Sequence, residues 1–120
     1  MRELREEYLK AAEGLKNRLT AMSDEFFRKP ELGLEEERTS AMMQEALKEA
    51  GFSIDSGVAG MKTAFKASFG SGSPRIALLA EMDALPGIGH GCGHNIAGMA
   101  SVGAGIALAR TLSSRLKPGE

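Results

Sequence analysis

The chain has 120 residues, enough for one domain with a hydrophobic core and too few for two ordinary domains. Fifteen Lys and Arg against sixteen Asp and Glu leave a formal net charge of -1 without a basic block, so nucleic acid is not an expected partner. One cysteine excludes an internal disulfide, and the charged N-terminus lacks the apolar core of a signal peptide. Both observations favour the cytoplasm.

Two amphipathic helices are predicted in the first half of the chain. Apolar residues recur every three or four positions over 2–28, and Pro30 ends this helix. Its stripe consists of Leu4, Tyr8, Ala11, Leu15, Leu19, Met22 and Phe26. The near-heptad spacing leaves a coiled-coil partner as an alternative. The second helix begins at the acids 35–37, which suit the positive end of a helix dipole, and extends to Ala50, with Gly51 as the left-handed residue that ends it.

Three strands are predicted next. Apolar and polar residues alternate over 52–56 and 62–69, which is typical of half-buried strands. The run 75–80 is apolar after Arg75 and does not alternate, which predicts a central strand covered on both faces and parallel to a neighbour. The expected fold class is therefore α/β, with helices on both faces of a mixed sheet.

A third helix is predicted from Asn95 to Leu112. Its fourteen-residue apolar stretch, 96–109, is shorter than the roughly 20 residues of a membrane span, so we interpret it as a core helix. Gly98, Gly103 and Gly105 cost about 1 kcal/mol each relative to Ala. We interpret them as positions where the helix backbone closely approaches the sheet.

The residues that carry chemistry lie between the third strand and this helix. No charged residue occurs over 84–109, so we expect this region to be buried, with Glu81 and Asp83 entering it from the strand. Two residues apart on a strand, both carboxylates point to one side, and they repel each other unless a proton or a cation lies nearby. Cys92 and His94 flank Gly93, which lets thiol and imidazole converge. These are ligands that Zn²⁺ prefers, and neighbouring carboxylates also suit Mn²⁺, Co²⁺ and Ni²⁺.

Two other kinds of site fit this pattern less well. The glycines do not match Gly-x-Gly-x-x-Gly in any register, and no Gly-Lys-Ser/Thr follows, which disfavours a dinucleotide or phosphate-binding loop. A nucleophilic Cys92 with His90 or His94 as its base remains open, but it gives Glu81 and Asp83 no role.

Three motifs in order resemble the amidohydrolase branch of metallopeptidase family M-twenty, over almost the whole chain. They are Lys-Pro-Glu-Leu-Gly-Leu-Glu-Glu from residue 29, Glu-Met-Asp-Ala-Leu-Pro-Gly from residue 81 and His-Gly-Cys-Gly-His-Asn from residue 90. That branch includes aminoacylase-like enzymes, hippurate hydrolases and aminobenzoyl-glutamate hydrolases. The resemblance implies a zinc-peptidase-like three-layer sandwich that binds two metal ions and is interrupted by a smaller lid domain, which often dimerises.

The resemblance also implies roles for individual residues. Cys92 and His94 would be metal ligands, and Asp83 would be the active-site acid that orients a ligand imidazole. Glu81 occupies the place where other branches carry a metal-binding His, and His90 would have a supporting role. The family's general-base glutamate, its further ligands and its lid lie beyond the segments that match this chain.

We therefore expect residues 1–120 to be the N-terminal portion of a catalytic domain, without the lid and dimerisation domain. The whole enzyme would be a metal-dependent amidohydrolase, with Zn or Mn, or alternatively Co or Ni. Its substrates would be N-acyl amino acids or small peptide-like molecules, and its partners would include neither nucleic acid nor membrane. We expect the chain to be inactive alone, with a homodimer as a possible assembly. The alternative is a non-catalytic metal-binding or subunit-interaction module from a truncated relative.

Overall fold

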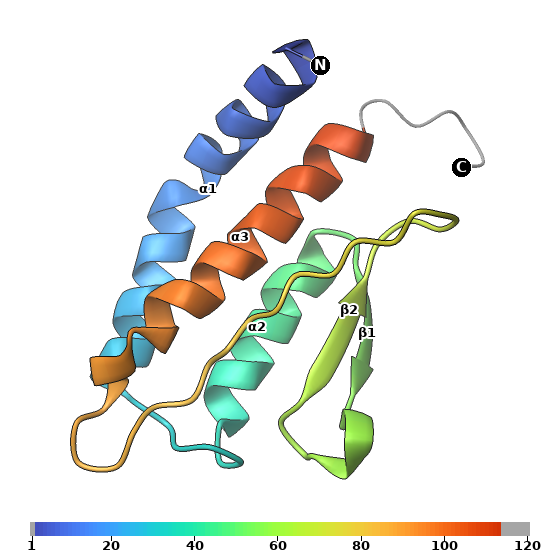
Figure 1. Cartoon of the computed structure of the whole chain (residues 1–120). Helices are drawn as coiled ribbons and strands as arrows, with labels where there is room; N and C mark the ends of the chain where they lie inside the picture. The colour runs from blue at the N-terminus through green and yellow to red at the C-terminus, as the bar shows by residue number, and fades with distance from the viewer. Residues whose placement is uncertain (1, 114–120) are drawn as a thin grey trace.

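The computed structural model describes residues 2–113, and within them it contains three α-helices and one β-hairpin. The helices are α1 (Arg2–Arg28), α2 (Glu37–Glu49) and α3 (His94–Ser113), and the strands are β1 (Ser53–Ser56) and β2 (Phe65–Ser68). Two short 3-10 turns, η1 (Val58–Gly60) and η2 (His90–Cys92), lie in the connections. Figure 1 shows α1 and α3 side by side, with the hairpin packed on α2. The mixed α/β class is confirmed.

The core is built from one face of each helix. The predicted stripe on α1 is confirmed, since Leu15, Met22 and Phe26 are buried. They meet buried residues of the other two helices, which are Met43, Ala46, Leu47, Met99, Val102, Ile106 and Ala107. Burying a Leu, Met or Phe side chain contributes about 1.5–3 kcal/mol. Helices α2 and α3 of the same chain thus cover the stripe, where a coiled-coil partner was the alternative.

Both ends of α2 follow from local chemistry. Gly51 has φ +97°. The Phe52 amide donates to the Leu47 carbonyl at 3.1 Å, and the Gly51 amide donates to Lys48 at 3.0 Å. These two bonds close the helix as predicted. At the other end, the Glu31 carboxylate accepts the backbone amides of Arg38 and Thr39, which the helix itself leaves unpaired.

The hairpin confirms two of the three predicted strands, each somewhat shorter than predicted. The strands are antiparallel, with Ser53 opposite Ser68 and Ser56 opposite Phe65. Along the second strand burial alternates as well: Phe65 and Ala67 are half-buried, and Lys66 and Ser68 are exposed. Thr63, in the turn before β2, connects the hairpin to α2, because its carbonyl accepts the Ser40 hydroxyl at 2.7 Å.

The predicted central strand over 75–80 is wrong for residues 2–113. The segment is extended, but it forms no backbone ladder with any other described residue, and Ile76 and Leu79 are 84% and 87% exposed. One hydrogen bond connects this segment to α3: the Ser101 hydroxyl donates to the Leu79 carbonyl at 2.6 Å. An apolar run becomes a central strand only when other strands flank both of its edges. The described chain supplies neither neighbour, so it contains no three-layer sandwich.

Helix α3 confirms the third predicted helix, and at 20 residues it is longer than the apolar stretch. Among the described residues it is the one helix whose length and composition would allow a membrane span, which is weak evidence because core helices meet the same criterion. It packs as a core helix: nine of its residues are buried, and four of them, Met99, Val102, Ile106 and Ala107, belong to the core shared with α1 and α2.

The glycines of α3 have different surroundings. A Cβ at Gly98 would overlap with the carbonyl oxygen of Glu81 and lie 2.8 Å from Cε of Met43. At Gly103 it would lie 2.5 Å from Leu19 Cδ1, whereas at Gly105 nothing comes closer than 3.7 Å. Close approach therefore explains Gly98 and Gly103 and does not explain Gly105. The neighbour at Gly98 is the end of the extended segment, where a sheet was predicted.

Candidate metal centre

The loop after α1 lies against the end of the extended segment and positions Asp83. The Ala84 amide donates to the Glu31 carbonyl at 2.8 Å, and Leu32 pairs with Ala84 in a single parallel bridge. A Cβ at Gly33 would lie 3.8 Å from Oδ2 of Asp83, so this loop passes directly beside the carboxylate. Two of the three family-like motifs are therefore in contact.

A second, glycine-rich loop carries the cysteine and both histidines. Leu85 and Gly89 exchange backbone hydrogen bonds of 2.8 and 3.0 Å, which closes the loop at its base. The Gly93 amide then donates to the His90 carbonyl at 3.0 Å, and Gly93 has φ +82°. This left-handed residue turns the chain from η2 into α3, as the sequence led us to expect.

The two acids and the Cys-x-His pair converge on the ring of His94. Its Nδ1 lies 2.9 Å from Oδ1 of Asp83, and its Nε2 lies 2.6 Å from Oε2 of Glu81. Nδ1 is also 3.1 Å from the Asp83 carbonyl oxygen, to which the Cys92 thiol donates at 3.6 Å. The imidazole thus lies between two carboxylates, with the thiol beside it.

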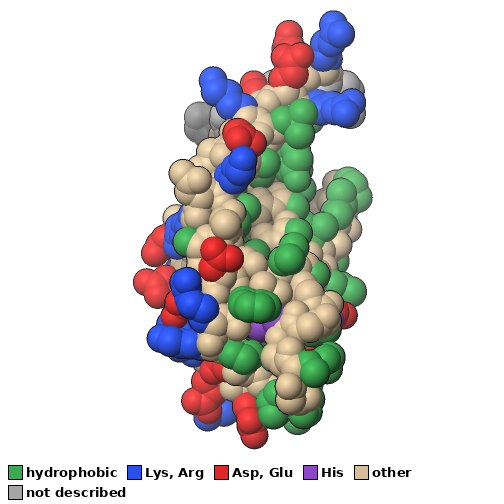
Figure 2. Space-filling view, turned by 90° about the vertical axis from the view of Figure 1, so that its left-hand side faces the viewer, with side chains coloured by type: hydrophobic (Ala, Val, Ile, Leu, Met, Phe, Trp, Pro, Cys, Tyr) green, Lys and Arg blue, Asp and Glu red, His purple; other side chains and the backbone are tan. Residues whose placement is uncertain are grey.

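The site is open to solvent on one side, which differs from the prediction of a buried region. The Glu81 side chain is 67% exposed, and the Asp83 and His94 side chains are 38% and 24% exposed. Ile88 and Ile96, inside the uncharged stretch, are 64% and 67% exposed. Figure 2 shows a histidine side chain visible between hydrophobic side chains on one face of the molecule. The uncharged stretch therefore contributes residues to the core and also exposes apolar side chains beside the site.

His90 is the buried member of the loop. It is 4% exposed, and neither ring nitrogen has a hydrogen-bond partner in the described chain. Burial lowers the pKa of His90, a positive charge on His94 lowers it further, and the Asp83 carboxylate acts in the opposite direction. Sequence reasoning indicated only a supporting role for this residue and could not show that its nitrogens are unpaired.

The donor chemistry fits a divalent cation, but the set is incomplete. With Nδ1 of His94 held by Asp83, Nε2 is the nitrogen left for a metal ion. Thiol and imidazole are donors that zinc prefers, and the unpaired nitrogens of His90 add donor capacity nearby. Within residues 2–113, however, no three His, Cys, Asp or Glu side chains are grouped closely enough to hold an ion.

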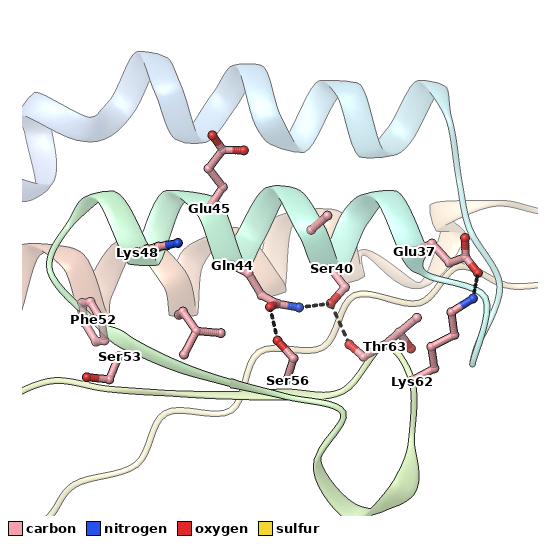
Figure 3. Close-up of a pocket in the computed structure, with 12 residues that line it drawn as sticks. Glu37, Ser40, Gln44, Glu45, Lys48, Phe52, Ser53, Ser56, Lys62 and Thr63 are labelled. Atoms are coloured by element: carbon pink, nitrogen blue, oxygen red, sulfur yellow. Dashed lines mark hydrogen bonds and ion pairs between the residues drawn. The ribbon is translucent and has the colours of Figure 1, made fainter.

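A cleft of about 800 Å³ lies elsewhere, between α2 and the hairpin (Figure 3). Its polar side chains bond to one another: Ser56 donates to Gln44 at 2.6 Å, and Gln44 donates to Ser40 at 2.9 Å. Lys62 pairs with Glu37 at one end. These side chains therefore satisfy one another's hydrogen-bonding and charged groups. None of the residues that line the cleft belongs to the Cys-x-His loop.

Comparison with known proteins places this geometry in a family context. No family model matches the chain. It is 38% identical over 119 residues to one component of the p-aminobenzoyl-glutamate hydrolase of Escherichia coli, covering 85% of this chain and 25% of that protein. It is 33% identical over 112 residues to the Xaa-Arg dipeptidase of Mus musculus, covering 84% of this chain and 26% of that protein.

The chain thus spans about a quarter of the length of these curated relatives. Both relatives are hydrolases of amide or peptide bonds by name, and enzymes of this kind generally use metal. The resemblance drawn from the three motifs is confirmed: over part of their length, the chain is homologous to amidohydrolases of the M-twenty type.

Proposed function

We propose that this chain forms part of the metal centre of a metal-dependent amidohydrolase. The substrate would be an N-acyl amino acid or a small peptide-like molecule. The names of the two relatives support this class, because p-aminobenzoyl-glutamate and an Xaa-Arg dipeptide each join an acyl group to the nitrogen of an amino acid.

The observation that carries the proposal is the placement of the His94 ring between two carboxylates with a thiol beside it. Cys92 and His94 would hold the ion, and Asp83 would accept the Nδ1 proton so that Nε2 presents its lone pair. A Zn or Mn ion, or alternatively Co or Ni, would polarise the amide carbonyl and activate water there, with two ions in the complete active site.

Glu81 now occupies the position that faces Nε2. The two atoms are 2.6 Å apart, so Glu81 must give up this contact before Nε2 can bind an ion. Its side chain is 67% exposed and can move into solvent. Glu81 therefore covers the nitrogen that would bind the ion.

Further ligands and the general base would come from parts of the enzyme outside residues 2–113. In the same way, the extended segment 75–80 would become the central strand of the three-layer sandwich once other strands pair with it. Residues 1–120 would then be the N-terminal portion of the catalytic domain, apart from the lid. The enzyme would be cytoplasmic and a homodimer, and the chain alone would not turn over substrate.

A non-catalytic interaction module is the second candidate, and one observation favours it. Ile76 and Leu79 expose most of their apolar surface on a segment whose backbone forms no ladder with described residues. Such a segment pairs readily with another strand. As a module of this kind, the chain would associate with a second protein and need no metal.

Equilibrium dialysis against Zn²⁺ and Mn²⁺ tests the first proposal. We expect the chain to bind metal, and Cys92→Ser or His94→Ala to remove that binding, while Ser113→Ala on the far end of α3 leaves it unchanged. Metal uptake that neither site substitution alters would contradict the proposal. The same samples are assayed with p-aminobenzoyl-glutamate, and turnover that Cys92→Ser abolishes would overturn the expected inactivity of the isolated chain.

A further inference from the structure

The segment 75–81 exposes its backbone and its side chains together. Every residue from 71 to 81 is exposed, and Ile76 and Leu79 reach 84% and 87%. Figure 1 shows the segment as an extended trace, and within residues 2–113 it belongs to no sheet. Exposed strand edges with unpaired amides and carbonyls pair readily with another chain. The segment is therefore a docking surface, and its sequence indicates which partner fits it.

One edge of the segment has no hydrogen bonds to any other described residue. Alternate residues of a strand present their amides and carbonyls to the same edge. The Leu79 carbonyl accepts the Ser101 hydroxyl at 2.6 Å, so a side chain of α3 occupies part of one edge. The amides and carbonyls of the opposite edge, at Ile76, Leu78 and Ala80, have no partner in the described chain. A second strand can therefore pair along this edge.

The charges of the segment make it complementary to itself. Its apolar residues, 76–80, lie between Arg75 and Glu81. If two copies pair antiparallel with these apolar residues opposite one another, Leu78 faces Leu78 and Arg75 faces Glu81 of the second copy. A parallel pair in the same register would place Arg75 beside Arg75 and Glu81 beside Glu81. Opposite charges directly across two strands stabilise the pair, and like charges destabilise it.

Both charged groups are available for this contact. Arg75 makes one long hydrogen bond, from Nε to the Gly72 carbonyl at 3.4 Å. Glu81 contacts His94 through Oε2, which leaves Oε1 without a partner among the described residues, and its side chain is 67% exposed. A two-fold axis through Leu78 would form the pair of Arg75 and Glu81 twice.

We propose that residues 75–81 are a dimerisation strand for two copies of this chain. The strands pair antiparallel through the edge of Ile76, Leu78 and Ala80, with Arg75 of each copy opposite Glu81 of the other. Both copies use the same surface, so the contact closes at a dimer. This inference does not depend on the proposed metal centre. In a complete amidohydrolase, a strand of the enzyme itself would compete for the same edge.

Sedimentation velocity of the full 120-residue chain tests the pairing. We expect a reversible equilibrium between monomer and dimer. Arg75→Glu should raise its dissociation constant at least about fivefold, because it places like charges across both strands, and adding Glu81→Arg should restore it. Arg5→Glu, an exposed position on α1, changes the net charge equally and should leave the constant unchanged. A chain that stays monomeric up to about 1 mM, or dimers that Arg75→Glu does not weaken, would overturn the inference.

Disulfide formation tests the orientation without changing a charge. In a Cys92→Ser background, Leu78→Cys should cross-link two copies on oxidation, because antiparallel pairing places these residues opposite each other. Ile76→Cys is the matched control, since in this register the two residues lie about 13 Å apart, too far for a disulfide. Equal cross-linking at both positions, or none at residue 78, would overturn the inference. Zn²⁺ uptake by the unmodified chain is measured separately, so either proposal can fail while the other stands.

Discussion

The imidazole of His94 is oriented by Asp83 through two contacts, 2.9 Å from Nδ1 to the carboxylate and 3.1 Å from Nδ1 to the backbone carbonyl. Both acceptors belong to one residue, so ring and backbone are positioned together. A carboxylate on one ring nitrogen fixes the tautomer and makes the other nitrogen a better metal donor. The roles of the two residues can therefore be separated by experiment.

Asp83→Asn should weaken Zn²⁺ binding about 10- to 100-fold, because the amide orients the ring less strongly and does not raise its basicity. The dissociation constant is measured by competition with a chelating dye. Asp24→Asn, an exposed position on α1, is the matched control and should bind as the unmodified chain does. Equal affinities in the two variants would contradict the orienting role.

Glu31 should make the stability of the fold depend on pH. Its carboxylate accepts the amides of Arg38 at 3.1 Å and Thr39 at 2.6 Å. Burial by itself would raise the pKa of Glu31, but these hydrogen bonds outweigh it and lower the pKa below 4.5. A lowered pKa in the folded state means that the stabilisation is present above the unfolded value and is lost as pH falls through the folded value.

Glu31→Gln should therefore cost about 0.5–2 kcal/mol at pH 7, the usual value of a helix cap, and should reduce the loss of stability in acid. Urea unfolding followed by circular dichroism at pH 3 to 7 measures both effects. Glu35→Gln, exposed in the same loop, serves as the control. If both variants have the same pH profile, Glu31 does not cap α2.

Gly98→Ala and Gly105→Ala should have opposite effects on stability. The added methyl group at residue 98 would overlap with the Glu81 carbonyl and should destabilise the fold by roughly 1–3 kcal/mol. At residue 105 it meets nothing closer than 3.7 Å, so the better helix propensity of Ala should stabilise α3 by up to about 1 kcal/mol. Thermal unfolding of the two variants gives the signs, and a neutral Gly98→Ala would disprove the close approach.

The exposed segment 75–80 should drive self-association of the isolated chain. The double substitution Ile76→Lys and Leu79→Lys should raise the concentration needed for association at least about tenfold, equivalent to about 1.4 kcal/mol. Sedimentation velocity over a range of concentrations measures this. Met61→Lys, another exposed apolar position, is the control. Association that the double substitution does not change would exclude this segment as the interface.

The helices, and the convergence of Glu81, Asp83 and His94, were predictable because their signals are local. A stripe such as Leu15, Met22 and Phe26 needs only the period of a helix, and Gly51 ends α2 by its own backbone preference. Glu81 and Asp83 reach one ring because they are two residues apart, as predicted. The roles of Cys92 and His94 as ligands remain predictions.

The failures concern contacts and backbone conformations that a local residue pattern does not encode. The segment 75–80 has the composition of a central strand, but pairing requires other strands, which a local pattern cannot supply. The residue directly before α2, Glu36, makes no capping hydrogen bond with its side chain. Glu31, five residues earlier in the chain, caps the helix in its place. Leu34 has φ +71° and is 70% exposed, a conformation that no residue pattern indicates for leucine.

The absorption spectrum of the chain with Co²⁺ tests the central claim most directly, because a bond from thiolate to cobalt produces an intense charge-transfer band. We predict this band in the unmodified chain and its loss in both Cys92→Ser and His94→Ala, since neither variant is expected to bind the ion. Spectra that are identical in all three proteins, or a cobalt complex without the thiolate band, would contradict a metal centre at Cys92 and His94.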